Sequence, residues 1–249
     1  MLGLGSSLAL GGAPSEFVLT NISGLDIWLQ YDTGFTADGS DAISQWDDQS
    51  GNDNHAVQAT TDFKPTLVSG AASFADANRD KMTFTAITNT VSTIFIVIEA
   101  DSSSSMTMFG NSGDSQVFYR INQAATVEFR IRKGSTAAED SSDVNSTAEP
   151  FIDDSTPHLI IFHQKSGLNM DIHIGGNGAD STHNETNYGV QGGGTNTDLV
   201  IDTIGVQGTN GNPFDGRILE FAVYDSTLSD ADITTIKTNI ANRTGVDLG

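Results

Sequence analysis

Apolar residues along this chain recur mainly with a period of two, the spacing of a β-strand, rather than with the spacing of a helix. Val127, Phe129 and Ile131 alternate with charged residues, which predicts an antiparallel strand with one buried face. Residues 94–98 (IFIVI) and 159–162 (LIIF) are apolar throughout, so we expect central strands that are covered on both faces. Roughly twelve strand-like segments follow one another between turn residues, which is typical of a β-sandwich.

Two segments in the first quarter of the chain give more detail. Residues 22–31 contain the sequence LDIWLQY, whose alternation predicts a strand with one apolar face. That face is expected to hold Leu25, Ile27 and Leu29, and the other face Asp26, Trp28 and Gln30. Residues 44–58 (SQWDDQSGNDNHAVQ) predict a strand, a tight turn and a second strand.

One helix is predicted near the C-terminus. Ser229 suits the N-cap position, and Asp232 three residues later gives an acidic version of a capping box. Gly245 is expected to end the helix, because glycine tolerates the left-handed conformation of a C-terminal cap. The apolar stripe of this helix consists of Ile233, Ile236 and Ile240. Such a helix is expected to cover one face of the sandwich.

Two polar, glycine-rich stretches are predicted as long loops, residues 133–150 and residues 175–198. Loops of this length inside a compact domain are often functional. The alternative is that they are solvated surface.

The amino-acid composition agrees with a β-sandwich and excludes some classes of binding partner. Hydrophobic residues make up 37% of the 249 residues, and there are 26 glycines, which favours many short strands joined by turns. The formal net charge is −21, which argues against nucleic acid and against an anionic membrane surface as partners. There are no cysteines, which excludes disulfides, Cys-ligated zinc and thiol catalysis. No run of apolar residues is long enough to span a membrane.

The chain is predicted to consist of an N-terminal Gly/Leu-rich arm, residues 1–15, and a single sandwich domain, residues 16–249. The arm has no Lys or Arg before its short apolar stretch, so a cleaved signal peptide is not expected. It is either a flexible leader or an anchor that docks on a partner. The predicted anchoring residues are Met1, Leu2, Leu4, Leu8 and Leu10.

Two parts of the sequence resemble laminin G-like, concanavalin A-like domains. WDDQSGNDNHAVQ (residues 46–58), followed by KPTLVSGAASF (64–74) and KMTF, is similar to their opening strands. FDGRILEFAVYDSTLSDADITTIK (214–237) is similar to their closing strand and helix. The resemblance implies an all-β fold, a jelly-roll sandwich of two antiparallel sheets with one short C-terminal helix. It implies a fold more than a function, because one fold hosts many functions.

The first 32 residues, from MLGLGSSLALGG to LDIWLQYD, resemble the start of virion structural proteins of tailed bacteriophages. This resemblance implies a non-enzymatic protein on the surface of a phage particle, which decorates the capsid or forms part of a fibre or tail appendage. Its partners would be other virion proteins and further copies of itself. The alternative is a carbohydrate-binding, lectin-like module that attaches to glycans of a host cell surface, for which Trp28 and Tyr188 are candidate aromatic platforms.

The sequence lacks the catalytic carboxylates that the resemblance would imply for an enzyme. Glycoside hydrolases of this fold family carry a Glu-x-Asp-x-x-Glu strand, and glycosidases divide acid and nucleophile roles between two carboxyl groups. The nearest acidic pair, Glu220 and Asp225, is five residues apart, so a regular strand would turn them to opposite faces. We therefore predict no catalytic residues.

Histidines and acidic turn residues are the candidate metal ligands in the sequence. His158 and His163 are five residues apart and are expected on opposite faces of one strand, with His173 on the next strand, so they are interpreted as polar ends of buried strands. No metal ligand and no cofactor is therefore predicted. Calcium is the alternative, because related domains often hold Ca²⁺ at a rim of the sandwich and Ca²⁺ takes oxygen ligands. The candidates are Asp47, Asp48, Asn52 and Asp53, which do not have EF-hand spacing and which also suit a turn.

Overall fold

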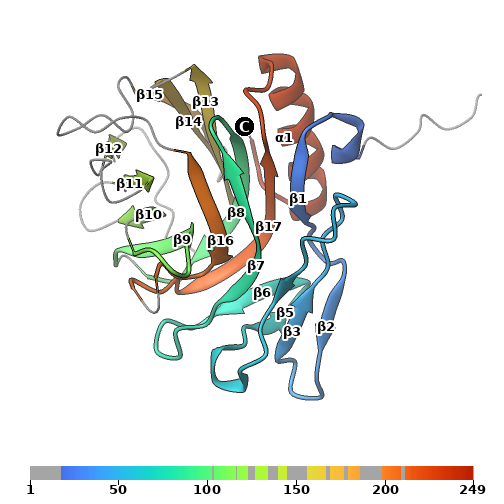
Figure 1. Cartoon of the computed structure of the whole chain (residues 1–249). Helices are drawn as coiled ribbons and strands as arrows, with labels where there is room; N and C mark the ends of the chain where they lie inside the picture. Colours follow the sequence, from blue (N-terminus) through green and yellow to red (C-terminus); the bar gives the residue numbers. More distant parts are fainter. Residues whose placement is uncertain are drawn as a thin grey trace, which may run out of the picture.

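In the part of the chain that the structure describes, two antiparallel β-sheets pack face to face, and one α-helix, α1 (Asp230–Thr244), lies on the outer side of one sheet (Figure 1). This computed structural model describes residues 18–102, 104–115, 117–122, 127–133, 140–144, 156–166, 169–176, 179–185, 198–208 and 211–248. The predicted fold class, a jelly-roll sandwich of two antiparallel sheets with a short C-terminal helix, is confirmed. No helix within these residues has both the length and the apolar character needed to cross a membrane.

The first sheet has eight strands, with β8 and β17 at its centre. In spatial order it contains β15 (Ala179–Glu185), β14 (Asn169–Gly176), β13 (His158–Ser166), β8 (Thr93–Ala100), β17 (Gly216–Tyr224), β6 (Ala71–Phe74) and β5 (Thr66–Val68), and β1 (Leu25–Leu29) pairs with β17. Every residue of β8 is buried, as expected for a central strand covered on both faces.

The second sheet has nine strands. In spatial order these are β12 (Asp140–Val144), β11 (Val127–Lys133), β10 (Val117–Asn122), β9 (Met106–Gly110), β16 (Leu199–Ile204), β7 (Met82–Asn89), β4 (Ala56–Val57), β3 (Ile43–Trp46) and β2 (Phe35–Ala37). Two short 3₁₀ helices, η1 (Leu19–Asn21) and η2 (Thr61–Phe63), lie between strands.

The described residues bury apolar side chains in two layers. The inner layer lies between the sheets and contains large aromatic residues such as Trp46, Phe109 and Phe221. The outer layer lies between the eight-stranded sheet and α1, and includes Trp28 and Tyr224. The stripe residues Ile233, Ile236 and Ile240 are buried in this outer layer, as the helical spacing predicts.

The predicted caps of α1 are confirmed. The hydroxyl oxygen of Ser229 accepts a hydrogen bond from the backbone N–H of Asp232 at 3.1 Å. Gly245 adopts a left-handed conformation with φ of 79°. Local signals therefore set both ends of this helix.

The prediction of two long loops is wrong in part, because each stretch contains a strand. β12 lies within residues 133–150, and β15 lies within residues 175–198. Both strands are at the edge of a sheet, where polar sequences are common because they oppose edge-to-edge association. Because these two strands are polar, their sequences could not be distinguished from those of loops.

The predicted faces of β1 also need correction. A β-bulge interrupts the pairing of β1 with β17 between Leu25 and Ile27. Consequently Ile27 and Leu29 enter the inner layer as predicted, while Leu25 joins Trp28 in the outer layer. An extra residue in a strand reverses the faces that follow it, and strict alternation does not reveal this.

Candidate functional site

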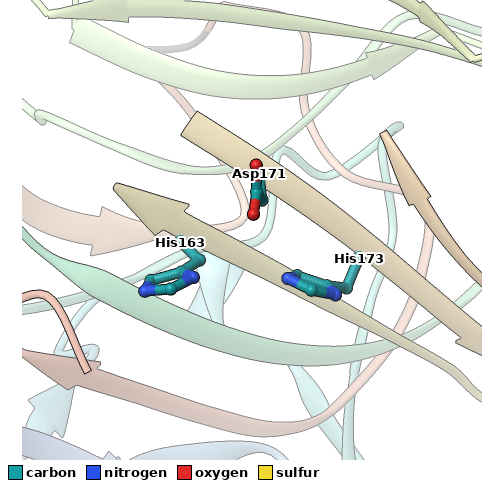
Figure 2. A group of neighbouring side chains, drawn as sticks. All are labelled: His163, Asp171 and His173. Atoms are coloured by element: carbon teal, nitrogen blue, oxygen red, sulfur yellow. The ribbon is translucent and has the colours of Figure 1, made fainter. Parts of the chain in front are cut away.

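Two side-chain clusters on opposite outer faces of the sandwich stand out. The first, the histidine cluster, consists of His163, Asp171 and His173 on the hairpin formed by β13 and β14. One potential ligand atom from each residue lies within 4.8 Å of the others. Figure 2 shows the two imidazole rings turned toward each other, with the Asp171 carboxylate beside the space between them.

The strand register places these three residues together. His163 lies directly opposite Asp171 in the antiparallel pairing of β13 and β14, and His173 is two residues further along β14 on the same face. On β14, Ile172 and Ile174 enter the inner layer, so Asp171 and His173 point to the side that carries α1.

A backbone carbonyl fixes the ring of His163. Its Nε2 atom lies 2.9 Å from the carbonyl oxygen of Leu228, the residue before the N-cap of α1. Because a carbonyl oxygen only accepts, Nε2 carries the proton and the neutral ring presents a lone pair at Nδ1. The Leu228 segment is itself held, since Thr93 Oγ1 donates to Ser226 O at 2.8 Å and accepts from Leu228 N at 3.2 Å.

The predicted orientation of His158 and His163 is confirmed. His158 and His163 lie on opposite faces of β13, as their spacing predicts. The hypothesis did not include Asp171, the residue that connects His163 to His173. The signal that could have found it is the pairing of the successive strands β13 and β14, whose register sets His163 opposite Asp171.

The second cluster, the sheet cluster, consists of Thr107, Phe118, Arg120 and Gln207 on the outer face of the nine-stranded sheet. Val117, Tyr119 and Ile121 of β10 enter the inner layer, so Phe118 and Arg120 face outward. The guanidinium carbon of Arg120 lies 4.2 Å from the centre of the Phe118 ring, a cation–π arrangement.

Hydrogen bonds hold Arg120 in this position. Gln207 Oε1 accepts from Arg120 at 2.6 Å and from Thr107 Oγ1 at 3.1 Å. Gln207 Nε2 donates to the Ser115 carbonyl oxygen at 3.2 Å. Arg120 is partly exposed, whereas Phe118, Gln207 and Thr107 are buried. The cluster thus supports one cationic, planar group at the surface.

The turn residues proposed for calcium are mostly engaged by the protein itself. The Asp48 carboxylate accepts from the backbone N–H groups of Trp28, Ser50 and Asn54 and from the Ser50 hydroxyl, at 2.7–3.0 Å. Asp48 therefore organises the turn, in accordance with the turn interpretation.

The other three turn residues differ in their surroundings. Asn52 Nδ2 donates to the Leu25 carbonyl oxygen at 2.7 Å, and Asp47 accepts from Gln45 Nε2 at 2.6 Å. Asp53 is exposed. Calcium binding at these remaining oxygen atoms stays a prediction.

Trp28 is not available as an aromatic platform, which corrects that candidate. Its ring is buried beneath α1, where its Nε1 atom donates to Glu220 Oε1 at 2.8 Å. Asp225, the other residue of the acidic pair considered above, is exposed, whereas Glu220 is buried. Tyr188 and the predicted anchoring residues Met1, Leu2, Leu4, Leu8 and Leu10 lie outside the described residues, so a role in virion assembly stays a prediction.

Comparison with known proteins identifies a family by sequence. The profile of the family described as the concanavalin A-like lectin/glucanases superfamily matches residues 68–234. No curated protein matches the sequence.

Solved structures are similar in fold over most of the chain. A GH54 α-L-arabinofuranosidase has a TM-score of 0.59 at 16% identity, and the match covers 82% of this chain and 51% of that one. The binding domain of Paraclostridial Mosquitocidal Protein 1 has a TM-score of 0.55 at 16% identity, covering 88% and 52%. This chain thus spans about half the length of these two structures.

A third structure matches over nearly its whole length. Domain 4 of AbnA, a GH43 extracellular arabinanase from Geobacillus stearothermophilus, in complex with arabinotriose, has a TM-score of 0.52 at 14% identity. The match covers 85% of this chain and 97% of that domain. At these identities the likeness establishes the fold.

Proposed function

Since the chain belongs to the concanavalin A-like lectin/glucanases superfamily, we propose that it is a non-catalytic carbohydrate-binding module whose ligand contacts the sheet cluster. The observation that carries this proposal is Arg120, a partly exposed residue whose guanidinium lies against the Phe118 ring and donates to Gln207. Small-molecule sites contain a few positioned polar groups, and Arg120 is such a group, supported by the buried Phe118 ring and Gln207.

The chemistry of Arg120 suits sugar hydroxyls. Guanidinium is planar and offers N–H donors in a fixed geometry, so it can bond to two neighbouring hydroxyl oxygens of a sugar ring. Because Gln207 and Phe118 already fix its position, little side-chain entropy is lost when a ligand binds. The four residues include no carboxylate, whereas glycosidases use two, so the cluster supports binding without hydrolysis.

The overall charge favours neutral saccharides. With a net charge of −21, the protein repels polyanionic glycans over distances up to the Debye length. Arabino-oligosaccharides are the first ligands to test, since the third of the similar structures, a domain of matching extent, was solved with arabinotriose.

The test is a glycan array with the full chain, with and without Ca²⁺, followed by calorimetry on the best neutral oligosaccharide. Arg120→Gln should weaken binding by about tenfold or more, as expected for a lost charge-assisted hydrogen bond. Arg79→Gln, at an exposed arginine outside the cluster, is the matched control and should bind normally. Absence of binding to any glycan would overturn the proposal, and equal affinity in Arg120→Gln would place the ligand elsewhere.

A further inference from the structure

The histidine cluster has no part in the proposed glycan contact, because it lies on the other sheet. We propose that His163, Asp171 and His173 bind one divalent transition-metal ion, with Zn²⁺ the best match. Two imidazoles and one carboxylate are a ligand set that Zn²⁺ takes in proteins, with a fourth position left for water.

The distances are close to those that a metal requires. A tetrahedral Zn²⁺ with bonds of about 2.0–2.1 Å separates its ligand atoms by about 3.3 Å. The three candidate atoms lie within 4.8 Å of one another, so side-chain rotations that bring them up to about 1.5 Å closer suffice. All three residues project from the paired strands β13 and β14, whose register already places them on one face.

The surroundings of His163 resemble those of histidines that bind metals. Metal-binding histidines usually donate their second ring N–H to a carbonyl or carboxylate, which fixes the tautomer and the ring orientation. His163 does this through Nε2 and the Leu228 carbonyl oxygen, and it thereby presents Nδ1 toward the cluster. The ring is 2% exposed, so water competes little for this position.

The ligand chemistry selects among cations. Ca²⁺ and Mg²⁺ bind oxygen ligands and gain little from imidazole. Zn²⁺, Ni²⁺ and Cu²⁺ bind imidazole well, and the Asp171 carboxylate supplies one negative charge toward the ion. Because metal ligands must be deprotonated, Zn²⁺ binding should weaken as the solution is made more acidic.

A bound ion would connect the adjacent strands β13 and β14 directly. Through the hydrogen bond between His163 and Leu228 it would also support the segment that leads into α1, which is far from these strands in sequence. Binding to the folded state alone raises thermal stability by mass action. The ion would therefore stabilise the pairing of β13 with β14.

The experiment uses the full chain after treatment with a chelator. Calorimetric titration with ZnCl₂ should show one site per chain, and the melting temperature should rise with Zn²⁺ and not with equal Ca²⁺. Asp171→Asn and His173→Gln should each weaken Zn²⁺ binding by tenfold or more and abolish the rise in melting temperature. His55→Asn removes a histidine outside the cluster and should behave like the wild type.

Substitution with Co²⁺ keeps the test decisive where a variant fails to fold. Strong visible absorption bands from the wild type would report a tetrahedral site with nitrogen ligands, and the weak spectrum of hydrated Co²⁺ would overturn the proposal. Absence of Zn²⁺ binding by the wild type, or equal binding by folded Asp171→Asn and His173→Gln, would also overturn it. Glycan binding in the same variants should be unchanged, so failure of one proposal is distinguishable from failure of the other.

Discussion

Glu220 and Arg243 form a buried ion pair that joins the central strand β17 to the last turn of α1. Trp28 Nε1 donates to the same carboxylate at 2.8 Å, and the Arg243 guanidinium lies 5.2 Å from the centre of the Trp28 ring. Glu220 is 1% exposed, and burial raises the pKa of its carboxyl group, while the hydrogen bonds from Arg243 and Trp28 oppose that rise. The outer apolar layer thus contains a polar network that fixes where the helix lies.

The raised pKa of Glu220 predicts how stability depends on pH. The folded state holds this proton to a higher pH than the unfolded chain does, so its contribution is fully present below the ordinary pKa of 4.5 and is lost as the pH rises through the folded value. Glu220→Gln removes this contribution. The free energy of unfolding in urea, measured between about pH 4 and pH 8, should fall less steeply in the variant than in the wild type.

The exposed Asp62→Asn provides the control for that measurement, since it removes one carboxylate that faces solvent. Its pH profile should run parallel to that of the wild type. Parallel profiles for Glu220→Gln as well would contradict the assignment to Glu220.

Removing the cation Arg243 alone should lower the free energy of unfolding more than removing the charge of Glu220 alone. Arg243→Met leaves the buried Glu220 carboxylate without its cation, and we expect the free energy of unfolding at pH 7 to fall by about 3 kcal/mol or more. Adding Glu220→Gln to this variant should recover part of the loss, because no buried charge then remains. A double variant as unstable as the sum of the single ones would show that the two residues are not coupled.

The sequence was informative wherever a feature depends on neighbouring residues. The caps of α1 at Ser229 and Gly245, and the fully buried strand β8, follow from local signals and are confirmed. Features that depend on register could not be predicted in this way. The meeting of His163 with Asp171, and the contact of Trp28 with Glu220, depend on strand pairing and on bulges that leave no mark in the local pattern.

Asp48 should be the acidic residue of its turn on which stability most depends. Its carboxylate accepts four hydrogen bonds, three from Ser50 and Asn54 of the turn and one from the backbone N–H of Trp28 in β1. Asp48→Ala leaves these donors unsatisfied in a mostly buried position, and the free energy of unfolding should fall by about 2–4 kcal/mol. Asp53→Asn in the same turn, with its side chain exposed and a left-handed backbone (φ 57°) that Asn tolerates, should change it by less than about 0.5 kcal/mol. Similar losses from both variants, measured by urea unfolding, would argue against this role of Asp48.

An acidic group at one end of the eight-stranded sheet should limit stability at neutral pH. Asp215, Asp76 and Asp101 adjoin the ends of the neighbouring strands β17, β6 and β8. Burial, followed by the charges of Asp76 and Asp101, raises the pKa of Asp215 above its ordinary value of 3.8. The folded state therefore binds this proton more tightly than the unfolded chain, and the contribution of Asp215 to stability is lost as the pH rises through the folded pKa.

Asp215→Asn should consequently raise the melting temperature at pH 7, because it removes one of three repelling charges and keeps an oxygen that can accept from the Asp76 backbone N–H. The gain should shrink as NaCl is added, since salt screens the repulsion in the wild type, and it should shrink as the pH is lowered and Asp215 of the wild type takes up its proton. Asp62→Asn, at an exposed position, removes the same amount of negative charge and should raise the melting temperature less. If the two variants gain equally at every salt concentration, the effect belongs to the overall charge of −21 and not to this group.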